Sequence, residues 1–158
     1  MTQEIERKFF VKNMPDLSGL KSIRDERYYL YSDGGIELRF QKHGKKYELE
    51  RMAEYANLSR TQEKIEITQN EFETLRRFGK GPIIRESYLI SQNPQVTVKI
   101  YHGRFEGLIR VEVEFESLDQ AQQFQPPDWF GKEMVDISIA KDAKLIDLAD
   151  EEFHKLVT

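Results

Sequence analysis

Apolar and charged residues alternate with a period of two along much of this chain, and no other feature restricts its fold as strongly. In a β-strand this alternation places apolar side chains on one face and charged side chains on the other. It is clearest in the segments 4–11, 36–41, 96–100 and 109–115. Weaker runs predict further strands at about 22–31, 46–51, 61–67 and 83–91. The chain is therefore predicted to be mainly β, with roughly eight strands.

The connections between these runs are short and rich in turn-forming residues. Asp33-Gly34-Gly35, His43-Gly44 and Asn93-Pro94 each suit a tight turn between two strands. Because a tight turn can only join strands that run in opposite directions, the sheet is predicted to be antiparallel.

Three helices are predicted between and after the strands, which places the chain in the α+β class. Thr68 and Glu71 form a capping-box signature for a helix that ends near Gly79. Ser117 begins a second short helix, which Pro126 must end. Apolar residues at helical spacing predict one amphipathic helix over about 139–157.

Eight antiparallel strands with a few covering helices predict a closed barrel, because closure removes the exposed edges of a sheet. The pattern alone leaves two arrangements open. In the more common one the apolar face fills the barrel, and in the other helices cover an apolar outside while charged residues line a wet lumen. Charged residues make up 33% of the chain, against about 25% in an ordinary domain. This surplus favours the charged lumen.

Composition excludes several classes of protein. A length of 158 residues fits a single domain spanning 1–158, with enough apolar residues for a core. The absence of cysteine excludes disulfides and thiolate metal sites. A net charge of -4 gives no overall field that would attract a nucleic-acid polymer. No apolar run is long enough to span a membrane and no secretion signal precedes the first strand, so we expect a cytoplasmic protein.

Two pairs of glutamates repeat the same arrangement on separate strands. Glu4 and Glu6 lie on one face of the first strand, about 6.6–7 Å apart, and Lys8 continues that face. Glu112 and Glu114 repeat the pair on the last predicted strand. Carboxylate ligands suit Mg²⁺ or Mn²⁺ rather than zinc. Since a Glu-x-Glu pair is more often a solvated face, the pattern alone makes a metal site only a hypothesis.

The N-terminal sequence EIERKF resembles the signature of the CYTH, or triphosphate tunnel metalloenzyme, family. Further pieces agree in their order, namely GIELRF around Arg39, LSR before a strand, a basic residue at Arg85, VEVEF at 111–115 and PPDWFGKE at 126–133. The resemblance implies an eight-stranded antiparallel tunnel with a charged lumen. It also implies that a triphosphate group binds there with a divalent metal ion. Activities of the family include inorganic triphosphatase, thiamine triphosphatase and class IV adenylate cyclase.

The resemblance assigns roles to residues of the predicted lumen. Four carboxylates are implied as metal ligands, and these are Glu4, Glu6, Glu112 and Glu114. Three basic residues are implied as substrate contacts on phosphate oxygens, and these are Lys8, Arg39 and Arg85. Lys8, Glu4 and Glu6 are also the implied catalytic residues, with Lys8 on phosphate or on a water. For Arg39 a surface ion pair with Glu37 or Glu48 stays open. Three tyrosines are expected to pack the barrel, and these are Tyr28, Tyr29 and Tyr31.

Several positions depart from the family's pattern, and all of them concern the lumen. Residues that the family uses there are replaced by Gln41, Met52, Lys64, Ser87 and Lys99, and Ala140-Lys141-Asp142 stands in place of a Tyr-x-Asn. A one-residue bulge that turns Arg51 or Glu63 inward would compensate for some of them. Otherwise Lys64 and Lys99 pair with Glu48 or Glu50 in the tunnel. Triphosphate affinity then falls, because charge-assisted hydrogen bonds are lost.

Two functions of different classes therefore stay open. In the first, the chain hydrolyses inorganic triphosphate, or an organic one such as thiamine triphosphate, with Mg²⁺ or Mn²⁺ and an activated water. Adenylate cyclase is a weaker version, because nothing in the sequence reads a purine. In the second, the tunnel is catalytically degenerate and binds another anion, a metabolite or a protein partner. A homodimer is compatible with the broad flank of a barrel, but no stripe of residues marks its interface.

Overall fold

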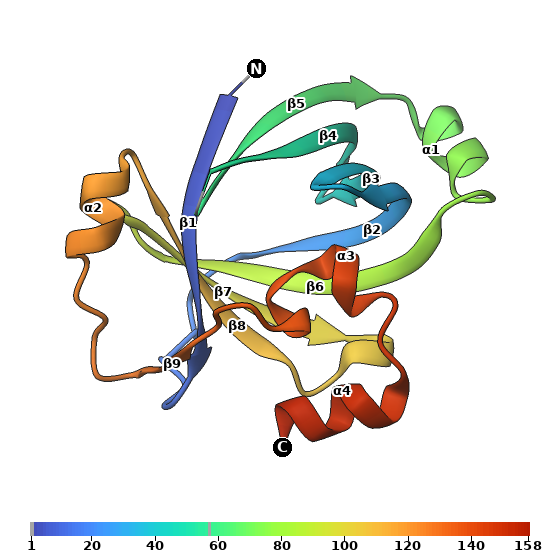
Figure 1. The fold of residues 1–158 in the computed structure, drawn as a ribbon. Helices are drawn as coiled ribbons and strands as arrows, with labels where there is room; N and C mark the ends of the chain where they lie inside the picture. Colours follow the sequence, from blue (N-terminus) through green and yellow to red (C-terminus); the bar gives the residue numbers. More distant parts are fainter. Residues whose placement is uncertain (1, 57) are drawn as a thin grey trace.

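Eight antiparallel strands close on themselves in the computed structural model, which describes residues 2–56 and 58–158 (Figure 1). The strands are β1 Thr2–Val11, β2 Ser22–Asp33, β3 Ile36–His43, β4 Lys46–Ala56, β5 Ser59–Ile67, β6 Lys80–Ser91, β7 Gln95–His102 and β8 Ile109–Phe115. Their order is β5-β4-β3-β2-β6-β7-β8-β1, and β1 also pairs with β5. The predicted closed antiparallel barrel is confirmed.

β1 joins the two edges of the sheet. On one side its residues 5–10 pair with β8, and on the other its residues 2–5 pair with β5. From Phe9 onward, the second side is taken by β9, a short strand at Phe130–Glu133 that the sequence did not predict. Arg7 of β1 holds it, with Nη2 2.6 Å from Oε1 of Glu133. β9 thus extends the wall where β5 curves away from β1 (Figure 1).

The two helices with capping signatures are present, and both are short. The helical segments are α1 Gln69–Leu75, α2 Leu118–Gln123, α3 Asp142–Leu145 and α4 Asp150–Val157, with 3₁₀ turns η1 at Gly103–Phe105 and η2 at Ser138–Ala140. The Thr68 side chain accepts from the Glu71 N–H, and the Glu71 carboxylate accepts from the Thr68 N–H. α1 ends at Leu75, earlier than predicted, because Gly79 has already turned back against Tyr28. None of the described helices is long and apolar enough to cross a membrane.

The prediction of one continuous helix over 139–157 is wrong. The chain forms η2, α3 and α4 instead. Arg104, which lies in a distant turn, binds the segment where α3 and α4 are separated. Its guanidinium donates to the carbonyl oxygens of Ile146 and Leu148 and pairs with the Asp150 carboxylate. These carbonyls therefore find a side-chain donor in place of the N–H groups of a further helical turn.

The apolar face of the strands points outward, where helices cover it. Ile5 and Phe9 of β1 belong to an apolar cluster that includes Ala121 of α2, at the left of Figure 1. At the opposite side of the barrel, Phe72 of α1 packs on Phe40 of β3 with ring centroids 5.6 Å apart. The charged face is left to line the interior. Of the two arrangements that the pattern left open, the structure has the charged lumen.

The C-terminal segment covers one end of the lumen. Lys8 Nζ donates to the carbonyl oxygen of Ala140 at 2.6 Å, and Arg110 Nη1 donates to that of Ile139 at 3.0 Å. Ile139 and Leu145 are fully buried in the apolar cluster beneath this segment. We call this end the base of the tunnel, and we define it by Arg27, Arg85, Arg110 and Asp142.

Thr68 provides a test of the capping box. Because its hydroxyl satisfies a backbone N–H that has no partner within the helix, we expect Thr68→Ala to lower the free energy of unfolding by about 1 kcal/mol. Thr68→Ser keeps a capping hydroxyl and is expected to stay within a few tenths of a kcal/mol of the wild type. Urea unfolding followed by circular dichroism measures both. Equal losses in the two variants would contradict the capping role.

Candidate functional site in the barrel lumen

A cavity of about 420 Å³ runs inside the barrel, and most of the side chains that line it are polar or charged. Five lysines and five arginines face six glutamates and two aspartates, so the described lining is slightly positive. All the residues to which the sequence assigned a role at the site lie on this lining, namely Glu4, Glu6, Lys8, Arg39, Arg85, Glu112 and Glu114. The tertiary structure therefore brings together residues from four different strands, β1, β3, β6 and β8.

Three carboxylates converge where β1 meets β8. Glu6 and Glu114 are direct cross-strand neighbours, and Glu4 precedes them on the same face. One oxygen from each of the three lies within 4.8 Å of the others. Burial raises the pKa of Glu6. Burial and the charges of Glu4 and Glu6 raise the pKa of Glu114 to about 7.

Such a cluster fits a hard divalent cation. Like charges directly opposite in a sheet repel each other, and a dication bound by their oxygens removes that repulsion. Mg²⁺ and Mn²⁺ are bound by carboxylate oxygens, at about 2.0–2.1 Å for Mg²⁺.

Glu112, the fourth predicted metal ligand, is already engaged by two cations. Its Oε1 lies 2.9 Å from Nζ of Lys99, and its Oε2 lies 2.7 Å from Nη2 of Arg110. Burial by itself raises the pKa of Glu112, but Lys99 and Arg110 outweigh it and hold the pKa well below its usual range. Its contacts position two lumen cations, and its role as a metal ligand stays a prediction.

The predicted phosphate contacts are buried in the lumen and paired with carboxylates. Arg39 is 4% exposed, so it does not lie at the surface, although the alternative pairing with Glu37 is present at 3.5 Å. Its Nη2 lies 3.0 Å from Oε2 of Glu50. Lys8 Nζ lies 3.3 Å from Oε1 of Glu6. Burial lowers the pKa of Lys8, and Glu6 opposes that change. Arg85 lies at the base, where its Nε donates to Asp25 at 3.0 Å.

The tyrosines of β2 take three different positions. Tyr28 packs beneath α1 as predicted, with its ring centroid 5.9 Å from that of Phe72. Tyr31 is 52% exposed, so the packing prediction is wrong there. The pairing of β2 with β3 shifts register between Tyr29 and Tyr31, which moves Tyr31 to a different face from the one its spacing implied. Tyr29 lines the cavity.

Two buried donors in this lining have no hydrogen-bond partner among the described residues. They are the Tyr29 hydroxyl and Nε of Arg39. The two residues lie directly opposite each other in the pairing of β2 with β3. A buried donor without a partner is costly. Both residues line the cavity, so an anion that reached these atoms would supply the missing acceptor.

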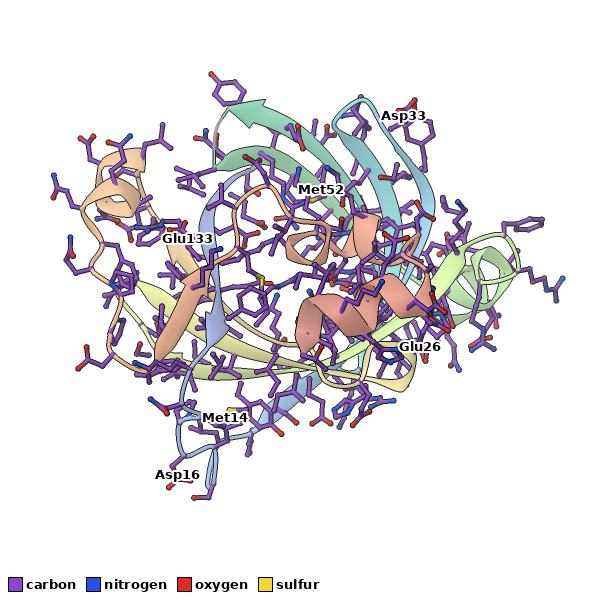
Figure 2. The ribbon with its side chains drawn as sticks, turned by 60° about the horizontal axis from the view of Figure 1, so that its bottom comes forward. Met14, Asp16, Glu26, Asp33, Met52 and Glu133 are labelled. Carbon is purple, nitrogen blue, oxygen red and sulfur yellow. The ribbon has the colours of Figure 1, made fainter. Side chains whose placement is uncertain are left out.

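Most of the unusual positions do lie in the lumen. Gln41, Lys64, Ser87 and Lys99 line the cavity. Lys64 pairs with Glu48 at 3.6 Å as expected, whereas Lys99 pairs with Glu112 instead of Glu48 or Glu50. Met52 is 1% exposed and lies within the body of the molecule (Figure 2). Its side chain is uncharged, so it contributes no cation at a position where the family has a lysine.

The bulge that would turn Arg51 or Glu63 inward is absent from the described part of β4 and β5. The two residues pair directly across these strands, and no register shift occurs near them. Both point outward, with Nη1 of Arg51 3.9 Å from Oε1 of Glu63 and side chains 48% and 58% exposed. The bulge interpretation is therefore wrong.

Sequence reasoning assigned no site role to several charged or polar residues of the lumen, among them Arg27, Arg60, Arg110 and Asp142. Arg110 could have been found, because it shares a strand face with Glu112 and Glu114. Arg60 likewise shares a face with Gln62 and Lys64. For Arg27 the signal was obscured, because charged residues occupy both faces of its strand. Asp142 was noted only as part of the Ala140-Lys141-Asp142 departure, and it was given no contacts because its segment was read as a continuous helix.

Comparison with known proteins agrees with this architecture. No protein-family model matches the chain. It is 34% identical over 137 residues to a protein of Nitrosomonas europaea named inorganic triphosphatase, and the match covers 84% of this chain and 89% of that protein. The crystal structure of the inorganic triphosphatase NE1496 superposes with a TM-score of 0.66 at 31% identity, covering 94% of this chain and 97% of that one. A conserved hypothetical protein from Pyrococcus furiosus shares the fold at 17% identity, with a TM-score of 0.56 and coverages of 75% and 82%.

The closed antiparallel barrel and its charged lumen define a class of tunnel proteins. The relative from Nitrosomonas europaea covers enough of the chain, at sufficient identity, to place it within one family. The chain belongs to the CYTH, or triphosphate tunnel metalloenzyme, family. The resemblance that EIERKF and the later motifs indicated is confirmed.

Glu50 tests how much charge pairing in the lumen stabilises the fold. It accepts from Arg39 at 3.0 Å, from Gln41 at 2.7 Å and from Gln62 at 2.9 Å. Burial by itself raises the pKa of Glu50, but the charges of Arg39 and Arg27 outweigh it, and the pKa is lowered from 4.5 to about 2. A carboxyl group with a lowered pKa stabilises the fold above its unfolded pKa, and this stability is lost as the pH falls through the folded pKa.

We therefore expect Glu50→Gln to lower the free energy of unfolding near neutral pH by on the order of 3 kcal/mol. The difference from the wild type should shrink as the pH falls from about 4.5 towards about 2, the folded pKa of Glu50. Urea unfolding at several pH values measures it. Glu63→Gln is the matched control, since Glu63 is 58% exposed on the outer face of the neighbouring strand. A difference that did not change with pH would contradict the assignment.

Proposed function

We propose that this chain hydrolyses inorganic triphosphate in its lumen with a divalent metal ion, Mg²⁺ or Mn²⁺. The observation that supports this most strongly is the convergence of the Glu4, Glu6 and Glu114 oxygens beside a row of buried cations. The relative from Nitrosomonas europaea is named inorganic triphosphatase, and the substrate class is taken from that name.

The proposed metal site is formed by Glu4, Glu6 and Glu114, with Glu112 next to it on β8. A bound dication supplies charge neutralisation at phosphate oxygens and lowers the pKa of a water molecule. Arg60 shares these carboxylates, with Nη2 3.1 Å from Glu4 and 3.8 Å from Glu6. Once the carboxylates have a second cation, the charge of Arg60 becomes available to phosphate.

The proposed phosphate contacts are the basic residues Lys8, Arg39 and Arg85, together with Arg60 and the Tyr29 hydroxyl. In phosphoryl transfer the protein itself does little covalent chemistry. It mainly positions the substrate and stabilises the negative charge of the transition state. Lys8 lies within 3.3 Å of Glu6 and so can hold a phosphate oxygen or a water beside the metal site. The two unpartnered donors, Tyr29 Oη and Arg39 Nε, favour an anion in this part of the lumen.

The carboxylate cluster gives the first test. Inorganic tripolyphosphate is incubated with wild-type protein and either metal, and phosphate release is measured beside Mn²⁺ binding by electron paramagnetic resonance. We expect metal-dependent release by the wild type, and a loss of at least about a hundredfold in Glu4→Gln and Glu6→Gln. Both variants should also bind Mn²⁺ more weakly.

Glu63→Gln serves as the control, because it removes a carboxylate from the outer face of a lumen strand. It should keep wild-type activity. If folded wild-type protein binds Mn²⁺ but releases no phosphate, the hydrolase proposal fails and a tunnel that only binds an anion remains.

Adjacent tyrosines on opposite faces of β2 give the second test. Tyr29→Phe removes only the hydroxyl that faces the lumen, and we expect tripolyphosphate affinity to fall about tenfold, the effect of one hydrogen bond to a charged group. Tyr28→Phe is its matched control, because the Tyr28 hydroxyl lies outside the barrel and donates to Glu26 at 2.7 Å. Isothermal titration calorimetry measures both. Equal affinities of the two variants would show that Tyr29 does not contact the substrate.

A further inference from the structure

One carboxylate at the base of the tunnel is surrounded by donors. Asp142 is 5% exposed. Its Oδ2 accepts from Nη1 of Arg27 and from Nη1 of Arg85, each at 2.9 Å. Its Oδ1 accepts from the Tyr101 hydroxyl at 2.6 Å and from Nη2 of Arg110 at 3.3 Å. Three arginines and a tyrosine therefore bind a single carboxylate, as they would bind a phosphate group.

The charge balance at the base depends on this residue. Arg85 also pairs with Asp25 at 3.0 Å, and Arg110 also pairs with Glu112 at 2.7 Å. Asp142 is the one carboxylate that forms an ion pair with Arg27 among the described residues, at 2.9 Å. Three arginines thus face three carboxylates, and Lys99 shares Glu112 as a further cation. Without the charge of Asp142, the three arginines would face only two carboxylates, and buried N–H donors would lose their acceptor.

The C-terminal segment holds this carboxylate firmly in place. Asp142 is the first residue of α3. The preceding residues are tied to the barrel wall by the hydrogen bond from Lys8 to the Ala140 carbonyl and by the ion pair of Lys141 with Glu54. Burial by itself raises the pKa of Asp142, but Arg85 and Arg110 outweigh it and hold the pKa well below its usual range. The carboxylate is therefore a fixed negative charge.

We propose that Asp142 is an internal anion that occupies the deepest anion-binding position of the tunnel and so limits how far a polyphosphate chain can enter. This inference takes the class of substrate from the proposed function. The contacts of Asp142 with the arginines are present whether or not the protein hydrolyses triphosphate. A triphosphate binds above the base, where Arg39 and Arg60 lie, and Lys8 lies between the two regions, with Glu6 at 3.3 Å and the Ala140 carbonyl at 2.6 Å. Arg85 uses two of its five N–H donors on carboxylates, so its remaining donors can still reach the innermost phosphate. A longer chain meets the Asp142 carboxylate and is excluded.

Removal of this charge should open the position to an external anion. Asp142→Asn keeps the size of the side chain and removes the charge. We expect metal-free Asp142→Asn protein to bind inorganic tripolyphosphate about tenfold more tightly than the wild type, and tetrapolyphosphate to gain more than tripolyphosphate. Isothermal titration calorimetry measures both. Asp147→Asn is the matched control, because Asp147 lies in the same segment but pairs with Lys80 at the surface, and it should bind as the wild type does.

Asp142→Ala provides a second test, which still works if loss of the carboxylate lowers the stability of the fold. The cavity left by the side chain is lined by unpaired arginines. We expect inorganic phosphate or formate to raise the melting temperature of Asp142→Ala by several degrees more than that of the wild type. A carboxylate with only a structural role predicts no such anion-specific rescue. If neither variant gains anion affinity and no anion raises the melting temperature of either, the inference is overturned.

The same measurements separate this inference from the proposed function. If the variants gain anion binding but the wild type releases no phosphate from tripolyphosphate, the internal anion stands and the hydrolase proposal fails. If the wild type hydrolyses tripolyphosphate and the variants gain nothing, the hydrolase proposal stands and Asp142 is only a structural partner of the arginines.

Discussion

The pairing of charges inside a closed barrel is the constraint on which the rest of this structure depends. A buried charge without a partner costs several kcal/mol, so each lysine or arginine that points inward needs a nearby carboxylate. Antiparallel pairing supplies such partners directly, as when Arg39 lies opposite Glu50 and pairs with it at 3.0 Å. Once the charged face points inward, the apolar face points to solvent, and α1 and α2 are needed to cover it.

The candidate site lies where this pairing is incomplete. Glu6 and Glu114 face each other as like charges, while the Tyr29 hydroxyl and Arg39 Nε are donors without acceptors among the described residues. The facing carboxylates favour a bound cation, and the donors without acceptors favour a bound anion. A metal–triphosphate complex presents both charges in one ligand. A lumen whose charges were all paired would be a stable core, but it would have no reason to bind a substrate.

The base of the tunnel differs from this site because its charges are balanced by the chain itself. Asp142 reaches the arginines from the C-terminal segment and completes a set of three arginines and three carboxylates. The two regions are connected, since Arg110 contacts both Glu112 and Asp142. How strongly the lumen attracts a polyanion is therefore set partly by a residue outside the barrel strands.

The sequence by itself determined the features that depend on local spacing. Period-two alternation predicted all eight strands of the barrel, the Thr68 and Ser117 caps predicted two helices, and the EIERKF motif placed Glu4, Glu6 and Lys8 on one face. Tertiary structure alone decided which carboxylates meet. Glu114 joins Glu4 and Glu6, whereas Glu112 is drawn to Lys99 and Arg110. It also decided the pairing of β9, the break in the C-terminal helix where Arg104 binds, and the meeting of Asp142 with Arg27. Each of these depends on strand register or on contacts between distant segments, and local spacing contains no information about either.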